Sequence, residues 1–402
     1  MKKLRIAFLT FEFVTEWNSG GGLGNYLNRI TKALRELGHE PEVFTLSREE
    51  AGVIVHEGTR VERVHRHYHF GLRAVRRLWK EHCSVTSSYY ALSIALAKAL
   101  QRREFDAPFD FVQSSNMGMC GYHVPSSRHR PHLVRLSGVR DLWRKTDDAY
   151  DVDSHILDWY EKRCVQGADV AYAPSQAIAK YMSWKANVPV RVVRPPVFLE
   201  AQPSPDPCDM PPRYLVHFGQ IGRRKGSDTL AEALSRAWRE APDLTMVLAG
   251  REIRSGSVAR YQQQWGSRAN QVLWLGPTEK SRLYAIVQSA EASVLPSVVD
   301  NLPNTVIESL MLGVPVIGTI GTSVDELVEQ GRSGELVAVE DPTALADALV
   351  RVWRKQVPWV RSQFQRPAIF EQMEPRYAAE RLIEAAGFAN GRCLWPEPHG
   401  EQ

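Results

Sequence analysis

The sequence predicts an α/β protein of two doubly wound domains, each built on a parallel sheet, that face each other across a cleft. Three observations predict this fold. Apolar runs rich in β-branched residues alternate with longer helical patterns, which is typical of βαβ units. The 402 residues are enough for two domains of ordinary size. Five prolines between Pro203 and Pro212 separate two such series of alternating patterns.

The first series occupies residues 1–200, and we expect its strands at Arg5–Leu9, Pro41–Leu46, Phe109–Gln113, His132–Leu136, Val170–Ala173 and Val190–Val193. Its main helical patterns are Leu23–Leu37, Ser87–Arg103 and Asp153–Gln166. A proline-rich linker, 201–212, follows. The second series, 213–370, predicts strands at Tyr214–Phe218, Leu244–Ala249, Gln271–Leu275, Ala292–Leu295 and Val314–Thr319. We expect the remaining segment, 371–402, to be helical and to pack on the first domain.

The composition is that of a soluble globular protein, with 44% hydrophobic and 24% charged residues. No apolar run approaches the ~20 residues that a membrane span needs. The N-terminal residues MKKLRIAFLT lead into Phe11-Glu12-Phe13 without a small-residue cleavage site, so they predict a buried strand rather than a signal sequence. The five cysteines are scattered and lack metal-type spacing, which favours reduced thiols in a cytoplasm.

Positive charge gathers between Arg60 and His82, where six Arg, one Lys and four His stand against two Glu, although the net charge is only +4. Apolar and aromatic residues interleave with these cations. Such a segment, Arg60 to Lys80 above all, can lie on an anionic membrane or bind an anionic acceptor. The alternative is a solvated helix and loop face. A nucleic-acid module is not recognisable, and the chain is not strongly basic overall, so we expect no nucleic-acid partner.

A glycine-rich loop follows the first expected strand, with Gly20, Gly21, Gly22 and Gly24 at the start of a helical pattern. Free amides and the helix dipole favour an anion at such a helix N-terminus. The spacing differs from G-x-G-x-x-G, which argues against a dinucleotide site. The alternative is a flexible loop that needs positive φ angles.

A second glycine-rich turn, FGQIGRRKG, follows the first strand of the second series and carries Arg223, Arg224 and Lys225. Three adjacent cations repel one another unless water or an anion compensates them, and a diphosphate would do so. The alternative is a solvated basic turn. The P-loop pattern is absent.

Two carboxylates, Asp300 and Glu308, stand eight positions apart in the segment PSVVDNLPNTVIESLMLGVPVIG. Thr305-x-x-Glu308 fits a capping box, which would explain Glu308 by helix capping alone. Capping leaves Asp300 unexplained, since it precedes the helix in a loop at a strand's carboxyl end. There a carboxylate can hold sugar hydroxyls, while the amides of Asn304, Thr305 and Val306 hold a phosphate.

FGQIGRRKG, DNLPNTVIESLMLGVPVIGT and SVDELVEQGRSGELV together resemble the second domain of the retaining glycosyltransferases of family 4, which have the GT-B fold. That family's motif is an acidic residue, then seven other residues, then a Glu, which is the spacing of Asp300 and Glu308. The N-terminal segment GGGLGNYLNRITKALRELGHEPEVFT and the later GADVAYAPSQAIAKYM resemble its first domain more generically.

The resemblance implies an acceptor domain followed by a donor domain and the transfer of a hexosyl or N-acetylhexosaminyl group from a nucleotide-diphosphate sugar to an acceptor hydroxyl. Glu308 would bind the ribose, Asp300 the transferred sugar, and Lys225 the diphosphate, with Arg223 or Arg224 adding charge. The other implied donor contacts are Gly21, Gly22, Leu275, Gly276, Pro277, Asn301, Leu302, Pro303, Asn304, Thr305 and Val306.

Three positions depart from the family pattern: Gln220 replaces an Arg, Ser137 stands where a His often touches the sugar, and Gly321-Thr322 replaces a Gly-Gly pair. Ser137 can hydrogen-bond a sugar but cannot act as an acid near neutral pH. Arg140 and Arg194 are further candidates for acceptor contacts.

For a retaining enzyme of this type the leaving diphosphate can take the acceptor proton, so no strong protein base is required. We expect no metal or other cofactor, because Lys225, a nearby Arg and helix N-termini would stabilise the charge that grows on the diphosphate. Asp151-Val152-Asp153 mimics an acidic metal pair, but its place at the start of a helical pattern favours capping. Two other readings remain open from the sequence: a nucleotide-sugar epimerase on the same fold, and a non-catalytic nucleotide-sugar-binding protein. The sequence leaves the nucleotide, the sugar, the acceptor and the oligomeric state undetermined.

Overall fold

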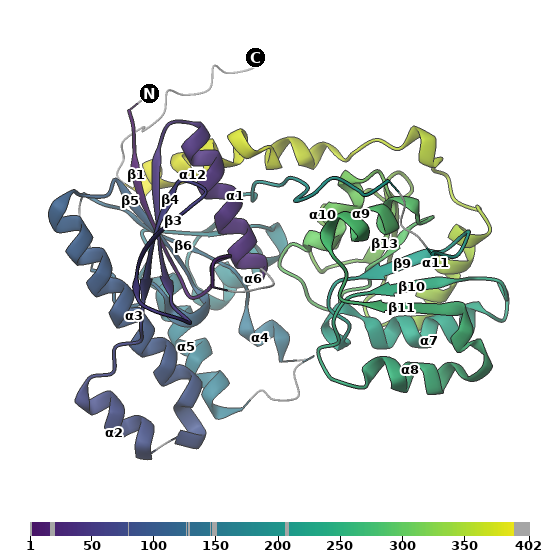
Figure 1. Cartoon of the computed structure of the whole chain (residues 1–402), viewed down its shortest axis with the longest axis horizontal. Helices are drawn as coiled ribbons and strands as arrows, with labels where there is room; N and C mark the ends of the chain where they lie inside the picture. Colours follow the sequence, from purple (N-terminus) through teal and green to yellow (C-terminus); the bar gives the residue numbers. More distant parts are fainter. Residues whose placement is uncertain are drawn as a thin grey trace. The chain divides into compact units, whose positions relative to one another are not determined.

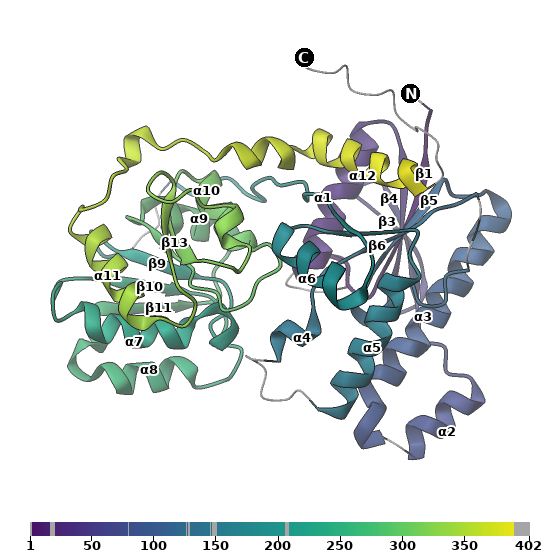
Figure 2. The ribbon, with the colours of Figure 1, turned by 180° about the vertical axis from the view of Figure 1, so that it is seen from behind.

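The computed structural model describes residues 2–16, 21–78, 80–125, 127, 129–144, 146, 151–205 and 209–389. The chain divides into two compact units. Unit 1 consists of Met1–Val197 and Glu371–Gln402, and unit 2 of Phe198–Phe370. Each unit has a sheet of its own with helices on both faces (Figures 1 and 2).

The unit 1 sheet has eight strands in the order β3-β4-β2-β1-β5-β6-β7-β8. Every neighbouring pair is parallel except β3 and β4, which form an antiparallel hairpin at one edge. The strands are β1 (Arg5–Thr10), β2 (Glu40–Leu46), β3 (Gly52–His56), β4 (Thr59–Val64), β5 (Phe111–Ser115), β6 (His132–Arg135), β7 (Val170–Ala173) and β8 (Val190–Val192). The sequence patterns predicted six of these strands and missed the hairpin.

The helices of unit 1 are α1 (Gly22–Glu36), α2 (Phe70–Leu78), α3 (Lys80–Asp106), α4 (Arg140–Trp143), α5 (Val152–Gln166), α6 (Gln176–Ala186) and α12 (Pro375–Ala389), with a short 3-10 turn, η1 (Met117–Met119). The α12 helix lies beside α1 (Figures 1 and 2). Its buried Leu382 and Ile383 share one apolar core with Leu27 and Ile30 of α1. The end of the described chain is thereby part of the N-terminal unit.

The unit 2 sheet is parallel throughout, in the order β11-β10-β9-β12-β13-β14. Its strands are β9 (Leu215–Phe218), β10 (Met246–Ala249), β11 (Val272–Gly276), β12 (Ser293–Val294), β13 (Val316–Thr319) and β14 (Gly334–Val337). Its helices are α7 (Ser227–Ala237), α8 (Ser257–Trp265), α9 (Lys280–Ser289), α10 (Asn304–Met311) and α11 (Pro342–Trp353). Short 3-10 turns are η2 (Arg223–Lys225), η3 (Gly266–Gln271), η4 (Val324–Glu326), η5 (Arg361–Gln363) and η6 (Ala368–Met373), the last of which crosses into unit 1.

Helices α7 and α8 lie on one face of this sheet, and α9 and α10 lie on the other (Figure 1). The core under α7, α8 and α11 is rich in large side chains, among them Trp238, Trp265, Leu349 and Trp353. Burial on both faces explains why the strands read as unbroken apolar runs in the sequence.

The division between the units falls after Val197 and not after residue 200. The first part of the predicted linker belongs to unit 2, because the Ser204 amide donates a hydrogen bond of 3.0 Å to the Ser281 carbonyl oxygen. Residues 206–208 of the linker and 390–402 of the C-terminal segment lie outside the described residues.

Cys83, Cys120 and Cys164 are free thiols. Cys208 and Cys393 lie outside the described residues, so the expectation for them stays a prediction.

Candidate functional site

The order of the unit 2 strands marks one position for a ligand. The chain passes from β9 to β10 on one side, whereas β12 pairs with the other side of β9. In an open parallel sheet, ligands bind at the carboxyl ends of the strands where the order reverses in this way. The two loops that flank this point are 219–226 after β9 and 295–303 after β12.

These two loops bring Lys225 and Asp300 into an ion pair, Nζ to Oδ2. The residues are 75 positions apart in the sequence, and their side chains are only 18% and 14% exposed. A backbone hydrogen bond of 2.9 Å from the Val298 amide to the Arg224 carbonyl oxygen ties the same two loops. The cation that the sequence assigned to a diphosphate is therefore held by a carboxylate of the protein.

Asp300 has further partners within its own loop and the next one. The Ser297 hydroxyl donates to Oδ2 at 3.2 Å, and the Asn301 amide donates to Oδ1 at 3.1 Å. The Ser323 hydroxyl donates to the Asp300 carbonyl oxygen at 3.3 Å. The backbone of Asp300 is thus fixed from the loop after β13, while its carboxylate is held by Lys225 and two neutral donors.

The other two cations of the turn have separate partners. Arg224 donates from Nη2 to Oε1 of Gln220 at 2.9 Å, so its guanidinium lies beside the residue that replaces the family's Arg. Arg223 is 51% exposed and lies 3.6 Å from Glu340. Of these two cations, Arg224 is the one that lies beside position 220, where the family pattern has an Arg.

Glu308 does not form the capping box expected from the sequence. The N-cap of α10 is Pro303, and no side chain caps the helix. Glu308 instead points to α9, where its Oε1 accepts from Lys280 Nζ at 2.6 Å and from the Tyr284 hydroxyl at 3.2 Å. Burial and the Glu308 charge raise the pKa of Tyr284. Glu308 is 5% exposed, so its geometry is set by tertiary contacts and not by helix capping.

The first turn of α10 supplies fewer amides than the sequence suggested. The Val306 N–H, which the sequence suggested for a phosphate, donates to the Pro303 carbonyl oxygen at 3.1 Å. The amides of Asn304 and Thr305 come before the first intrahelical bond, as expected at a helix start. The Thr305 methyl lies 3.0 Å from the position of a Cβ on Gly219, so this turn abuts the loop after β9.

The loop at the end of β11 carries Leu275, Gly276 and Pro277. Gly276 adopts a φ of +67°, and its carbonyl oxygen accepts from the Gly250 amide at 2.8 Å. Because β11 is two strands from β9, this loop lies at the same edge of the sheet but about 10 Å from the switch point. Asn301 and Leu302 are half-buried in the loop that leads to α10.

A buried histidine of β9 is connected by hydrogen bonds to the turn that carries Lys225. His217 of β9 is within hydrogen-bond distance of the Val294 carbonyl oxygen at 2.7 Å and of the Ser227 hydroxyl at 3.0 Å. The Ser227 oxygen also accepts from the Gly222 amide at 2.9 Å. Burial lowers the pKa of His217 to about 4, so the ring is neutral near pH 7. These hydrogen bonds link β12, β9 and the turn that carries Lys225.

In unit 1, the N-terminus of α1 already holds an anion of the protein. Gly21 is the N-cap, and Glu12 Oε1 accepts from the Gly24 amide at 3.2 Å. A Cβ on Gly21 would overlap the Glu12 carboxylate, whereas a Cβ on Gly22 would meet nothing within 4 Å. Burial raises the pKa of Glu12. The sequence missed this carboxylate, although it stands on the loop between the expected strand and the glycines.

The acceptor candidates lie at the carboxyl ends of β6 and β8. Ser137 accepts from Arg135 at 3.0 Å and donates its amide to Asn116 at 2.8 Å. Arg194 is 8% exposed and donates to the Pro174 carbonyl oxygen at 2.8 Å, so it supports the neighbouring loop.

Arg140 forms an ion pair of 3.1 Å with Glu161 of α5, a carboxylate that the sequence reasoning missed. Glu161 also accepts from the Gly118 amide at 3.0 Å. Burial raises the pKa of Glu161. Within unit 1, Glu161 of α5 therefore contacts both Arg140 and η1.

Lys280 and Tyr284 were the other residues that sequence reasoning missed. Their spacing of four places them on one face of a helix, directly after the GPTEK turn, which was the available signal. Only the packing of α9 against α10 reveals that this face meets Glu308.

No group of three or more metal-binding side chains was found among the residues that the structure describes. Asp151 is the N-cap of α5, with Oδ1 accepting from the Ser154 amide at 2.9 Å, as predicted. Asp153 accepts from the amides of Val85 and Thr86 at 2.6 and 2.9 Å.

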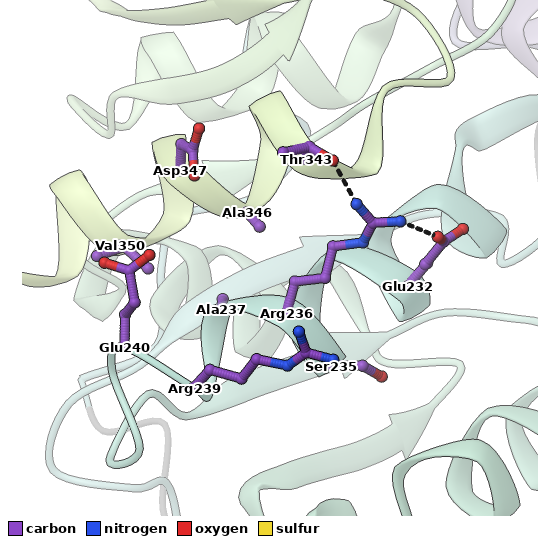
Figure 3. Close-up of a pocket in the computed structure, with 10 residues that line it drawn as sticks. All are labelled: Glu232, Ser235, Arg236, Ala237, Arg239, Glu240, Thr343, Ala346, Asp347 and Val350. Atoms are coloured by element: carbon purple, nitrogen blue, oxygen red, sulfur yellow. Dashed lines mark hydrogen bonds and ion pairs between the residues drawn. The ribbon is translucent and has the colours of Figure 1, made fainter.

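A groove of about 620 Å³ lies elsewhere in unit 2, between α7 and α11 (Figure 3). Arg236 crosses it and contacts both Glu232 and Thr343. Its walls carry charges of both signs, and no residue predicted from the sequence to bind a ligand lines it. The loops at the switch point remain the stronger candidate.

Two family models match the chain. Residues 21–197 match the "Glycosyl transferase 4-like domain" and residues 212–355 match "Glycosyl transferases group 1". The matches fall on unit 1 and unit 2 respectively, and the second includes the loops 219–226 and 295–303 of the candidate site.

Curated relatives match over part of their length. α-Maltose-1-phosphate synthase of Mycolicibacterium smegmatis is 26% identical over 55% of this chain and 61% of that protein. D-Inositol 3-phosphate glycosyltransferase of Corynebacterium urealyticum is 26% identical over 55% of this chain and 56% of that protein. The matched region thus spans less than two thirds of either relative.

Solved structures match nearly the whole chain. Sucrose-phosphate synthase from Thermosynechococcus elongatus has a TM-score of 0.67 at 18% identity, covering 96% of this chain and 95% of that chain. Anabaena Alr3699/HepE, solved with UDP and glucose, has a TM-score of 0.69 at 17% identity, covering 95% and 98%. This likeness confirms the GT-B fold class predicted from the sequence.

Proposed function

Since the chain belongs to the family 4 glycosyltransferases, we propose that it transfers a sugar from a nucleoside diphosphate sugar to an acceptor hydroxyl with retention of configuration. The single observation that carries this proposal is the ion pair of Lys225 and Asp300 at the switch point of unit 2. It places a cation suited to a diphosphate beside a carboxylate suited to sugar hydroxyls.

In this proposal the diphosphate meets Lys225, Arg224 and the amides of Asn304 and Thr305. Glu308 binds the ribose hydroxyls, and the Lys280 ammonium orients its carboxylate from 2.6 Å. The positive groups stabilise the charge that grows on the diphosphate as it leaves, which lowers the barrier because they interact more strongly with the transition state.

The reaction step needs no strong protein base. The bond between the anomeric carbon and the diphosphate oxygen breaks, and a bond to the acceptor oxygen forms on the same face. The acceptor proton passes to the departing oxygen. Ser137 can therefore stand in place of a His without loss of an essential acid, and no metal is needed where Lys225 and Arg224 supply the charge.

A donor screen tests the proposal. The anomeric product and free nucleotide are measured after incubating the full chain with UDP-, GDP-, ADP- or TDP-glucose and hydroxyl acceptors. UDP-glucose is the first donor to try, because structures of Anabaena Alr3699/HepE contain UDP, UDP-glucose and glucose. Bound donor should also raise the melting temperature in proportion to its affinity.

Lys225→Ala and Glu308→Ala should each lower transfer at least tenfold. Binding without turnover in wild type would indicate the non-catalytic alternative, and no binding of any nucleotide would contradict the proposal.

We also propose that unit 1 rests on an anionic membrane from the cytoplasmic side. Two cations of the basic stretch are paired within unit 1 and are not available to a membrane. Arg60 pairs with Glu42 and Glu62, and Arg63 lies within 4 Å of Glu16 and Glu49. Among the side chains of this stretch that the structure describes, Arg66, Arg73 and Arg77 are exposed cations, and Phe70 is 89% exposed. A cationic face with one exposed aromatic ring is suited to a bilayer surface.

None of the helices in the described ranges has the length and apolarity to cross a bilayer. Flotation with vesicles of phosphatidylglycerol and of phosphatidylcholine tests surface binding. Wild type should float with the anionic vesicles alone, and Phe70→Ser combined with Arg73→Gln should abolish this. Equal recovery of the variant would contradict the membrane proposal.

A further inference from the structure

We infer that Asp300 discriminates the sugar-loaded donor from the spent nucleoside diphosphate, because it competes with a phosphate for Lys225 unless sugar hydroxyls occupy it. The inference deepens the proposed function and rests on it for the identity of the ligand. It assigns to Asp300 a role in product release in addition to sugar contact.

The charge of Lys225 is neutralised by a carboxylate of the protein itself. Lys225 and Asp300 are both mostly buried, and among the described residues Asp300 is the carboxylate that pairs with Lys225. The contact joins the turn after β9 to the loop after β12, so it spans the position where a diphosphate would bind. A phosphate that enters must take the ammonium from the carboxylate or share it.

The cost of that exchange depends on what else the ligand brings. If Lys225 turns to a phosphate, the Asp300 carboxylate keeps two neutral donors, the Ser297 hydroxyl and the Asn301 amide. A buried carboxylate that loses its cation is destabilised. The transferred sugar ring offers hydroxyl donors to the same carboxylate, whereas the ionised terminal phosphate of a spent nucleoside diphosphate offers none.

The charge of the terminal phosphate also weakens the binding of the spent nucleotide relative to the donor. The terminal phosphate of a nucleoside diphosphate has a second ionisation near pH 6, by analogy with other phosphate monoesters, and esterification by a sugar removes it. At pH 7 the spent nucleotide is therefore the more negative ligand, and it is repelled more strongly by Asp300. Both effects weaken product binding relative to donor binding.

Glu308 is not suited to this role. Its cation, Lys280, comes from α9 and not from the turn that receives the diphosphate. A phosphate at Lys225 therefore leaves the pair of Glu308 and Lys280 intact, and only the Asp300 carboxylate loses its partner.

The test compares wild type, Asp300→Asn and Asp347→Asn by titration calorimetry with inorganic pyrophosphate, UDP and UDP-glucose. Asp347 is exposed in the groove of Figure 3, so its substitution removes the same charge from unit 2 away from the site. Asp300→Asn should bind UDP and pyrophosphate at least fivefold more tightly, while UDP-glucose binds no more tightly than to wild type. Asp347→Asn should match wild type for all three.

An unchanged ratio of UDP to UDP-glucose affinity in Asp300→Asn would overturn the inference, as would equal tightening for both. Asp300→Ser serves the same test with a smaller side chain, and a melting curve checks that each variant is folded. Should neither wild type nor these variants bind pyrophosphate or UDP, Lys225 holds no diphosphate and the inference is also overturned.

The outcome separates this inference from the proposed function. Tighter pyrophosphate binding by Asp300→Asn, in a wild type that transfers no sugar, would support the role of the ion pair and contradict the proposed transfer. Normal sugar transfer by wild type, with an unchanged ratio of UDP to UDP-glucose affinity in Asp300→Asn, would support the proposed transfer and contradict the role of the ion pair.

Discussion

Gly226 lies directly against Pro296: a Cβ on Gly226 would overlap the Pro296 carbonyl oxygen. Gly226 also has a φ of +74°, which disfavours other residues. The contact joins the turn that ends at Lys225 to the loop that contains Asp300. The absence of a side chain here is what allows the two loops to approach closely enough for their ion pair.

Gly226→Ala should therefore separate the two loops. We expect a loss of at least tenfold in donor affinity and of about 2 to 4 kcal/mol in the free energy of unfolding. Calorimetry with UDP-glucose and chemical denaturation measure the two effects. Gly256→Ala is the matched control, because Gly256 has a φ of +84° but no atom within 4 Å of its Cβ position. It should lose stability by about 1 kcal/mol and keep donor affinity; the same affinity loss in both variants would refute a role for the loop contact.

Lys280→Met should raise the KM for donor at least fivefold with a smaller change in kcat. The substitution removes the ammonium 2.6 Å from Glu308, which then loses orientation but not its place in the site. Steady-state kinetics with a saturating acceptor separate the two constants. Lys280→Arg keeps the charge and should recover most of the affinity. If Lys280→Met left KM unchanged, Lys280 would have no positioning role.

Thr305→Val should change the free energy of unfolding by less than about 0.5 kcal/mol. The capping box that the sequence suggested would have made the hydroxyl worth about 1 kcal/mol, but α10 has no side-chain cap. Valine keeps the shape of the side chain, including the methyl against Gly219. Chemical denaturation measures the difference, and a loss above 1 kcal/mol would show that the hydroxyl does cap the helix.

Gly21→Ala should destabilise unit 1 by about 1 to 3 kcal/mol, because its methyl would overlap the Glu12 carboxylate. Gly22→Ala is the matched control, since nothing lies within 4 Å of its Cβ position. Glu12→Ala in the Gly21→Ala background should recover part of the loss, which thermal melting of the four chains measures as a double-mutant cycle. Strict additivity would show that the two residues do not interact.

Acid should destabilise the chain through its buried histidines. Burial lowers the folded pKa of His217 to about 4 from 6.5, and that of His132 likewise. Between these values the unfolded state binds the proton and the folded state does not, so stability falls as pH drops from 6.5 towards 4. Each ring contributes at most about 3 kcal/mol over this window.

Melting temperature measured from pH 7.5 to 4.5 tests this effect. His217→Gln should show a shallower decline than wild type, and the exposed His129→Gln should keep the wild-type slope. Parallel curves for wild type and His217→Gln would contradict the assignment.

Local sequence patterns predicted most of the fold. The alternation of β-branched strands with helical segments predicted the α/β class, and three segments of the second domain together resembled the family. The hairpin of β3 and β4 was missed, although Glu57 and Gly58, both with positive φ, form its turn. Its strands lie beside and within the basic stretch, so Arg60 and Arg63 were read as surface cations when they pair with buried carboxylates.

The sequence by itself determined which loops follow which strands and which charged residues those loops carry, because turn and strand signals depend on neighbouring residues. Only the tertiary structure decided which charge meets which. Lys225 reaches Asp300, Lys280 reaches Glu308, and Glu12 occupies the N-terminus of α1. Those pairings depend on strand order and helix packing, which join positions far apart in the chain, and no local pattern specifies them.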